Sequence, residues 1–426
     1  MSRNNTGGAR RDRRLAAAPI YLLLSGAFGL FFAMIATINL VYQFEVARLS
    51  PLQLVLVGTL LESVAFICEV PTGIVADLYS RRLSVIVGFA LVGAGFVLEG
   101  LVPTFAAILL AQVIWGVGIT FTSGATEAWV ADEVGEAAAG PLFLRGTRAA
   151  QIGGLLGIFV SVGLASINLR LPIILGGALI VALALFLAFA MPERGFAPTP
   201  QPERNSFQKL GATFLAGARV VRASAILLTI LAVIVFRGGA SEAYDRLSQA
   251  HFLANLTFPA LGGLDTVVWF GIIAATGKLL TIGATVMVGR RLGTGSPHGA
   301  ARLVFLLNGL QLVAVVALGL ATNFGLAVAA VLVISVTRNV IQPVLTTWIN
   351  QQLAPGVRAT VLSMTAQTDA LGQIAGGPAL GLVGDFFSIR AAITASGLLL
   401  GPALLILLPA LRRPVGGPVG QESVGE

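Results

Sequence analysis

Cysteine, histidine and charge are all scarce in this chain of 426 residues. Its one cysteine, Cys68, excludes a disulfide framework, and its two histidines, His251 and His298, exclude a His/Cys metal cage. Charged residues make up 11% of the chain, whereas a soluble protein carries about 25%. Because 56% of the residues are hydrophobic and mean hydropathy is +0.90, we expect lipid, not water, to surround most of the molecule.

Signatures of enzymes and of nucleic-acid binding are missing as well. There is no Gly-x-x-x-x-Gly-Lys-Ser/Thr loop to cradle a phosphate, so ATP is not expected to supply energy. We expect both histidines in loops, which leaves no Ser/His/Asp set. The net charge of +8 comes from short basic clusters between those runs, a pattern of membrane topology and not of a DNA-binding face. We predict no enzyme activity, no metal, no cofactor and no nucleic-acid partner.

Long apolar runs dominate what is present. A membrane-crossing helix needs about 20 mostly apolar residues. Twelve such runs occur, at roughly 20–43, 51–76, 83–102, 104–131, 145–167, 171–191, 224–246, 262–289, 298–320, 324–349, 357–384 and 390–411. The sequence therefore predicts an all-α membrane protein with a 1–19 tail, a 20–192 six-helix bundle, a 193–223 linker with an amphipathic helix, a 224–411 six-helix bundle and a 412–426 tail.

The distribution of basic residues predicts the orientation in the membrane. About 20 of the 27 Lys and Arg fall in the two tails and the even-numbered loops. By the positive-inside rule, both termini are expected in the cytoplasm. The two halves also repeat weakly: Thr126 to Ala131 ends the fourth run, and Thr346 to Asn350, with its own tryptophan, ends the tenth. Duplicated halves are typical of secondary transporters, which bind substrate where the repeats meet.

The connection after the second run carries the most specific motif. It reads Gly73-Ile74-Val75-Ala76-Asp77-Leu78-Tyr79-Ser80-Arg81-Arg82. This segment resembles the loop signature of the major facilitator superfamily, G-x-L-A-D-R-x-G-R-R. Leu78 replaces the usual basic residue and Ser80 the usual glycine. The resemblance covers residues 20–411 and implies two pseudo-symmetric bundles that open alternately to the two sides of the membrane.

The same resemblance implies a latch at the cytoplasmic mouth. Small residues such as Gly73 would allow close approach of helices. Asp77 would form a charge network with Arg81 and Arg82, and Asp132, at the end of the fourth run, is the expected partner. Elsewhere the chain departs from superfamily patterns, since Gln112 stands where proton-coupled exporters often carry arginine. That departure weakens the case for proton antiport.

Five charges fall near the middle of expected spans, where an isolated charge costs about 2.5–3.5 kcal/mol. They are Glu62, Arg237, Lys278, Arg338 and Asp369. The superfamily fold implies that the second and eleventh helices meet across the halves, which would bring Glu62 near Asp369. A carboxyl group that leaves water holds a proton more tightly, so either residue is a candidate proton carrier.

The alternatives to a proton carrier are static contacts. Asp369 would then pair with Lys278, or Glu62 with Arg338. Glu69 lies two turns from Glu62 on the same helix face and is a further proton-coupling candidate, with a structural hydrogen bond the favoured role.

Other polar residues have weaker signals. We expect Asn39 and Gln373, with Gln151, to be polar contacts in the cavity. Glu99 and Glu127 lie near the ends of expected helices, where water or a loop arginine can reach them, so both are expected to be structural.

These observations predict a multi-pass transporter of a bacterial cytoplasmic membrane. It would act as a monomer among membrane lipids and export amphipathic or hydrophobic small molecules by alternating access, driven by the proton gradient. The alternative is transport of a small anionic metabolite, with Arg237, Lys278 and Arg338 as ligands. A third possibility is a lipid translocase or receptor that uses the same fold without transport.

Overall fold

Helices form almost all of the computed structural model, which describes residues 16–197, 219, 221–222, 224–260, 265–292, 297–351, 353 and 358–412. The first half holds α1 (Ala17–Ala36), α2 (Asn39–Glu45), α3 (Pro51–Leu78), α4 (Arg81–Leu101), α5 (Phe105–Thr122), α6 (Ala125–Val134), α7 (Glu136–Ala165) and α8 (Leu171–Ala190). The second half holds α10 (Ala225–Asn255), α11 (Thr266–Leu292), α12 (Pro297–Leu320), α13 (Phe324–Gln351), α14 (Arg358–Phe386), α15 (Ile389–Leu398) and α16 (Gly401–Arg412). The expected linker helix and both tails lie largely or wholly outside the described residues.

Three of the expected spans are broken helices. The first consists of α1 and α2, the fourth of α5 and α6, and the twelfth of α15 and α16. Between α5 and α6 the chain turns at Gly124, whose φ of 68° is a left-handed value that favours glycine. Each broken span is, taken as a whole, long and apolar enough to cross a membrane.

Eleven helices in the described part of the chain are long and apolar enough to cross a membrane. The expected span at 357–384 is not among them, although α14 is a helix of 29 residues there. Its composition explains the difference, because α14 carries Asp369, Gln373 and several glycines in place of large apolar side chains. One of these glycines, Gly376, lies so close to α10 that an added Cβ would be 2.6 Å from the Cα of Gly239.

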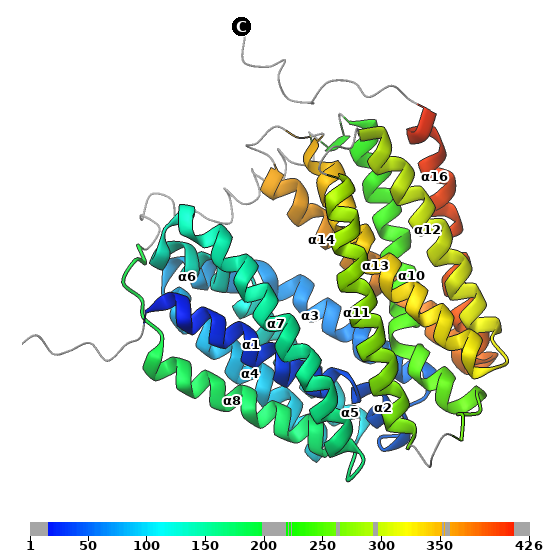
Figure 1. Cartoon of the computed structure of the whole chain (residues 1–426), viewed down its shortest axis with the longest axis horizontal. Helices are drawn as coiled ribbons and strands as arrows, with labels where there is room; N and C mark the ends of the chain where they lie inside the picture. Colours follow the sequence, from blue (N-terminus) through cyan, green and yellow to red (C-terminus); the bar gives the residue numbers. More distant parts are fainter. Residues whose placement is uncertain are drawn as a thin grey trace, which may run out of the picture.

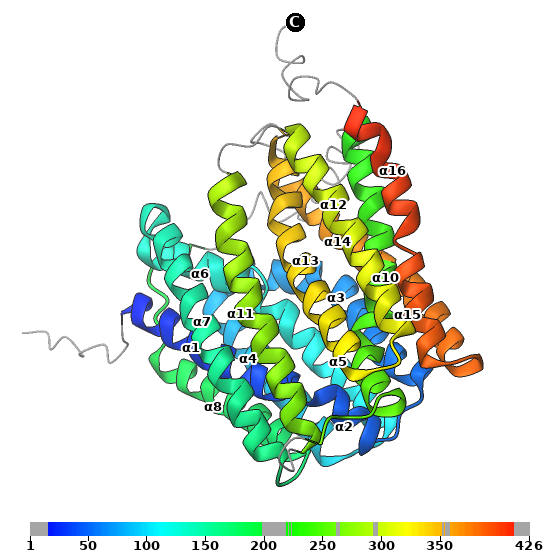
Figure 2. The same cartoon turned by 45° about the vertical axis from the view of Figure 1, so that its right-hand side comes forward.

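The helices form two bundles, one from each half of the chain (Figures 1 and 2). The bundles diverge at the end where α1 begins and α16 ends, and they converge at the opposite end (Figure 1). At the converging end α2 contacts α10, and α3 packs against both α10 and α14. An apolar cluster there joins both halves, with Ile38 and Leu54 from the first and Leu247 and Ile393 from the second. The two other apolar clusters each belong to one bundle.

Candidate functional site

A largely buried ion pair within α10 lies at the contact between the two bundles. Glu242 Oε1 accepts a hydrogen bond from Arg246 Nε at 3.0 Å, and the two side chains are 3% and 17% exposed. Gly58 of α3 lies directly against this pair, since a Cβ added to it would be 1.6 Å from Glu242 Oε1. The seam between α3 and α10 therefore leaves no room for a side chain at residue 58.

Glu62 stands one turn beyond Gly58 on the same face of α3. It is half-buried and makes no hydrogen bond or ion pair with any residue that the structure describes. Glu242, Arg246 and Asp369 are close enough to act on it electrostatically. The structure thus places Glu62 and Asp369 at one seam, while their role in carrying protons stays a prediction.

Asp369 lies in the wall of a cavity of about 520 Å³ between α10, α12, α13 and α14. Gln373, one turn further along α14, donates to Asp369 Oδ2 at 3.0 Å. Arg237 and Arg338 line the same cavity. Among the described residues, no basic nitrogen lies within 4.0 Å of the Asp369 carboxylate, the limit for an ion pair. The pairing of Asp369 with Lys278, one of the alternatives, is therefore not found.

Amides, not a carboxylate, hold Arg237. Its Nη1 donates to Asn308 Oδ1 at 2.7 Å and to Gln311 Oε1 at 3.5 Å, both on α12. Amide oxygens satisfy the N–H groups without cancelling the charge. Arg237 therefore keeps its positive charge beside the cavity of Asp369.

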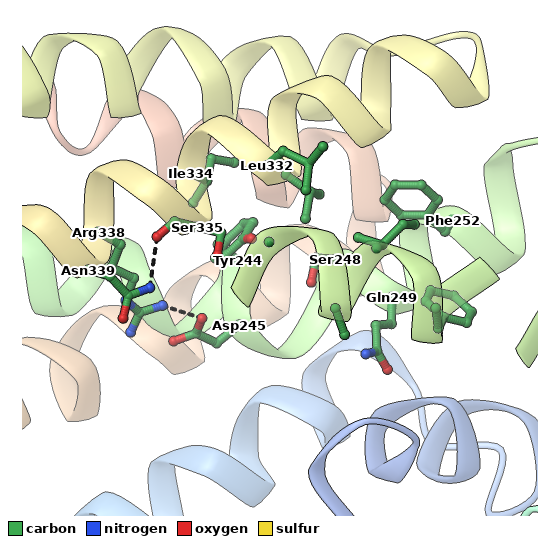
Figure 3. Close-up of a pocket in the computed structure, with 15 residues that line it drawn as sticks. Tyr244, Asp245, Ser248, Gln249, Phe252, Leu332, Ile334, Ser335, Arg338 and Asn339 are labelled. Carbon is green, nitrogen blue, oxygen red and sulfur yellow. Dashed lines mark hydrogen bonds and ion pairs between the residues drawn. The ribbon is translucent and has the colours of Figure 1, made fainter. Parts of the chain in front are cut away.

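Arg338 of α13 forms an ion pair with Asp245 of α10, and not with Glu62 as one alternative predicts (Figure 3). The pair borders a cavity of about 420 Å³ that Tyr244, Phe252 and Phe270 also line. The side chains are 37% and 33% exposed, so the pair is only partly buried.

The sequence does not single out Asp245, because it lies next to the expected end of a helix. The expected seventh span ends at residue 246, which puts Asp245 at a membrane surface, whereas α10 continues to Asn255. The helical spacing of Glu242, Asp245 and Arg246 is the sequence signal that could have indicated charged contacts on α10.

Lys278 of α11 reaches across to the first bundle. A Cβ added to Gly154 of α7 would be 2.2 Å from its Nζ atom. Lys278 lines a cavity of about 320 Å³. Gln151 of α7 lines it too, as expected of a polar cavity contact. No carboxylate among the described residues lies within ion-pair distance of Lys278.

The first bundle has an aromatic pocket of about 570 Å³ between α1, α4, α5, α6 and α7. Phe28 packs against Phe32 and Phe89, with ring centroids 5.5 Å and 5.0 Å away. Polar side chains also line the pocket, among them Ser25, Thr122, Thr126 and Glu127. The pocket suits an apolar body that carries a polar group.

Glu69 has a structural contact at the break between α5 and α6. Its Oε1 accepts a hydrogen bond from Ser123 Oγ at 2.9 Å. This geometry agrees with the structural role favoured for Glu69. It leaves Glu62 and Asp369 as the stronger candidates for proton coupling.

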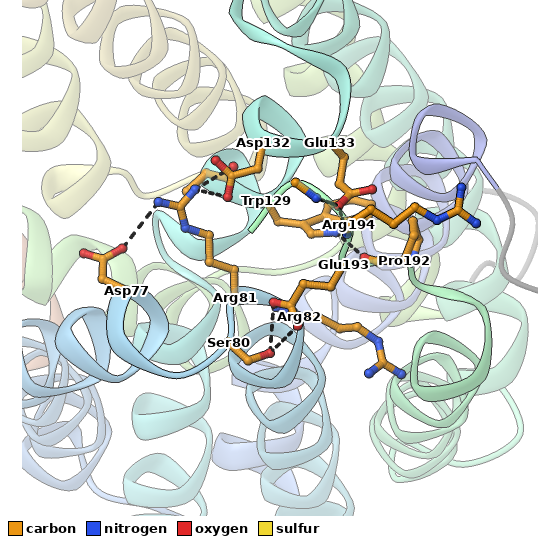
Figure 4. Close-up of polar contacts among 12 residues, drawn as sticks. Asp77, Ser80, Arg81, Arg82, Trp129, Asp132, Glu133, Pro192, Glu193 and Arg194 are labelled. Atoms are coloured by element: carbon orange, nitrogen blue, oxygen red, sulfur yellow. Dashed lines mark hydrogen bonds and ion pairs between the residues drawn. The ribbon is translucent and has the colours of Figure 1, made fainter. Parts of the chain in front are cut away.

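Arg81 joins three elements at the diverging end of the first bundle (Figure 4). It forms a short ion pair with Asp132 of α6 and lies 3.7 Å from Asp77 of α3. It also donates to the carbonyl of Ala128 at 3.0 Å and stacks over Phe196, with 5.8 Å between Cζ and the ring centroid. The expected Asp77–Arg81–Asp132 network is therefore present, and all three members belong to the first bundle.

The neighbouring residues of the motif have other partners. Glu193, just after α8, accepts hydrogen bonds from the Ser80 hydroxyl and from the backbone N–H of Arg82 (Figure 4). Arg82 also donates to the carbonyl of Ala188. The expectation for Gly73 is wrong in this conformation, because no atom lies within 4 Å of an added Cβ.

Two polar residues of the first bundle have surroundings that the sequence does not indicate. Glu99 of α4 is completely buried, at 0% exposure, so the expected contact with water is wrong, whereas its hydrogen bonds with Gln43 and Gln112 are consistent with the expected structural role. Asn39 is absent from the walls of the four cavities described above and instead lies against the Glu99 carboxyl group. The expected helix end was misleading because α2 and α5 cover this part of α4.

Comparisons with known proteins agree on one fold. Residues 17–368 match the family model described as Major Facilitator Superfamily. An "uncharacterized MFS-type transporter YxaM" of Bacillus subtilis (strain 168) is 23% identical over 374 residues, which are 85% of this chain and 88% of that protein.

Solved structures give the same result. A point mutant of the nucleoside transporter NupG has a TM-score of 0.76 at 16% identity, over 93% of this chain and 99% of that one. A bacterial homolog of the human lysosomal transporter Spinster, in an inward-facing and unoccupied conformation, has a TM-score of 0.75 at 16% identity, over 95% of this chain and 98% of that one. At these identities the likeness shows a shared fold.

Proposed function

The chain belongs to the major facilitator superfamily of membrane transporters, and we propose that it exports amphipathic or hydrophobic small molecules in exchange for protons. It acts as a monomer in a bacterial cytoplasmic membrane, with both termini in the cytoplasm. The structure then opens toward the cytoplasm, at the end where the bundles diverge (Figure 1). Transport proceeds as the bundles rock about the seam between α3 and α10.

One observation carries the proton-coupling proposal. Arg246 and Arg338 are neutralised by Glu242 and Asp245, whereas Glu62 and Asp369 have no ion-pair partner among the described residues. Both are half-buried carboxyl groups beside the seam that opens and closes. A group whose contact with water changes in each half of the cycle binds a proton on one side and releases it on the other.

The aromatic pocket supports the substrate class. Phe28, Phe32 and Phe89 offer apolar surface to the body of a substrate, while Ser25 and Glu127 offer hydrogen-bond acceptors to its polar part. Ligand pockets commonly combine a mostly apolar lining with a few polar groups.

The test is proton release from acid-loaded inverted membrane vesicles. A pH-sensitive dye would report proton movement while amphipathic cations, neutral hydrophobic drugs and organic anions are added in turn. We expect a response to the hydrophobic compounds that disappears when Glu62→Gln and Asp369→Asn are combined. The matched control is Glu136→Gln, an exposed carboxylate at the start of α7, which should respond like the wild type. A double variant that kept full coupling would overturn the carrier assignment.

Transport of a small anionic metabolite is the second candidate. Lys278 and Arg237 favour it, because neither has a carboxylate within ion-pair distance among the described residues. In that case Lys278→Gln should raise the apparent substrate constant for an anion sharply. An exporter of neutral compounds would be nearly unaffected.

A further inference from the structure

Lys278 is a cation without a counter-charge at a place where the two bundles meet. The cavity that it lines lies between α7 of the first bundle and α11 and α13 of the second. Among the described residues, no acidic side chain lines this cavity and no carboxylate lies within ion-pair distance of Lys278. A partly buried charge without a partner is unfavourable within a membrane, so the cavity suits a ligand that brings a negative charge.

Other polar groups of the same cavity can donate hydrogen bonds to such a ligand. Thr281 Oγ1 is buried and has no hydrogen-bond partner among the described residues. The Gln151 amide and the Ser335 hydroxyl line the cavity as well. Asn339 completes the polar lining, and its amide nitrogen donates to the backbone carbonyl of Ser335 at 2.7 Å. An ammonium group surrounded by hydroxyl and amide donors is a suitable site for a carboxylate.

The cavity of Lys278 adjoins the aromatic pocket of the first bundle. Ala150 of α7 lines the aromatic pocket, and Gln151, the next residue, lines the cavity. A Cβ added to Gly154 would collide with Lys278 Nζ and would lie 3.6 Å from the carbonyl oxygen of Gly29, which belongs to the wall of the aromatic pocket. The ammonium group therefore lies beside one end of that pocket.

Glu127 lies toward the other end of the aromatic pocket. It acts electrostatically on the hydroxyl of Tyr21, whose ring lies against Gly146 of α7. From Gly146 to Gly154 the helix advances by eight residues at about 1.5 Å each, or about 12 Å. An anionic group is thus attracted to one end and repelled from the other, so a ligand with one negative charge has one favoured orientation.

We propose that the exported compounds are amphipathic organic anions, with the apolar body in the aromatic pocket and the anionic group at Lys278. This inference rests on the proposed export and narrows its substrate class to acids with an apolar body. The bound anion would contact aromatic side chains of the first bundle and Lys278 and Thr281 of the second. It would therefore link the two bundles directly.

The test compares one apolar body with three different ends: 4-phenylbutanoate, 4-phenylbutanamide and 4-phenylbutylammonium. Binding to the purified full-length protein would be measured at neutral pH, where the acid is ionised, by calorimetry and by tryptophan fluorescence. Trp115 serves as a reporter, because its ring centroid is 6.4 Å from that of Phe32 in the aromatic pocket. We expect the acid to bind at least about tenfold more tightly than the amide, since hydrogen bonds to a charged group are stronger than those to a neutral one. The ammonium compound should bind most weakly.

Two variants test the cavity itself. Lys278→Gln should remove most of the preference for the acid and leave the affinity for the amide nearly unchanged. Thr281→Val keeps the size of the side chain and the charge of Lys278 but removes the buried hydroxyl, so it should weaken binding of the acid about two- to tenfold. The matched control is Arg145→Gln, which removes an exposed cation of α7 that does not line the aromatic pocket. It should keep the full preference for the acid.

Several results would overturn the proposal. One is equal binding of acid and amide, or no binding of the acid, by the wild type. Another is a preference for the acid that both Lys278→Gln and Thr281→Val leave unchanged. Acetate or chloride that competed as well as unlabelled 4-phenylbutanoate would show a site for small anions that does not use the aromatic pocket, and tighter binding of the ammonium compound would show selection by Glu127 instead. These measurements need no transport, so their failure would leave proton-coupled export of neutral compounds to be tested separately in vesicles.

Discussion

The two bundles place their ion pairs at different depths. In the first bundle the ion-paired groups gather at the diverging end, around Arg81 and Asp132, and the pocket above them is aromatic. In the second bundle Arg338 and Asp245 form an ion pair away from the ends of α13 and α10, beside a cavity. The pockets of the two halves thus differ in chemistry: the pocket of the first is mainly aromatic, and the cavity of the second borders an ion pair.

This difference suggests a division of labour. An apolar surface binds the apolar part of a substrate in many orientations. Charged groups in the middle of a membrane are unfavourable, and where they occur they commonly have a function. The three predictions below test whether the division holds, in order of decreasing expected effect.

Separating Arg338 from Asp245 should have the largest effect. Asp245→Asn leaves the guanidinium without its carboxylate, and losing a hydrogen bond to a charged group costs about 1.5–3 kcal/mol. We expect transport to fall at least tenfold in Asp245→Asn and in Arg338→Gln, measured as flux in proteoliposomes. The double variant should lose less than the sum of the two, because the pair is removed together. Additive losses would mean that the ion pair is not a functional unit.

Removing an aromatic ring from the first bundle should have an intermediate effect. Phe28→Ala deletes apolar surface worth roughly 1.5–3 kcal/mol when fully buried, so the apparent substrate constant should rise about tenfold or more at similar maximal flux. Phe189→Ala is the control, because that ring lies on α8 and is 80% exposed. If both variants bound hydrophobic substrates equally well, the aromatic pocket would not be the substrate site.

The network at the diverging end should show the smallest effect. Asp132 pairs closely with Arg81, whereas Asp77 is 60% exposed and 3.7 Å away. Partly exposed ion pairs contribute about 0–1 kcal/mol. We expect Asp132→Asn to lower Tm slightly and Asp77→Asn to leave it unchanged, both measured on purified protein. The reverse order would show that Asp77 is the main partner of Arg81.

Much of the fold follows from sequence pattern alone. Long apolar runs predict the helices, and the motif from Gly73 to Arg82 indicates the superfamily, which the match over residues 17–368 confirms. The charge network of Arg81 was also predictable, because signature residues and Asp132 fall at corresponding helix ends. These features depend on local sequence.

The candidate site was less predictable, because contacts between distant helices decide it. Asp245 was placed at a span boundary that the structure moves outward, and so its pairing with Arg338 was missed. The burial of Glu99 depends on coverage by α2 and α5, which no local pattern reveals. The close approach at Gly58 is likewise a property of two helices and not of one.

Alternating access requires the two bundles to rock about the seam at Gly58, and distances between the bundles at both ends test this directly. Spin labels would be placed, after replacement of Cys68, at Leu144 and Met287 near the diverging end and at Ile167 and Phe387 near the converging end, all exposed positions. Pulsed electron paramagnetic resonance then measures both distances in Gly58→Ala and in the control Gly309→Ala, whose added Cβ meets no atom within 4 Å.

The account predicts that Gly58→Ala shortens the Leu144–Met287 distance and lengthens the Ile167–Phe387 distance, because the new methyl group cannot fit against Glu242. Gly309→Ala should change neither distance. Distances that stay the same in Gly58→Ala, or that lengthen or shorten together, would contradict alternating access about this seam.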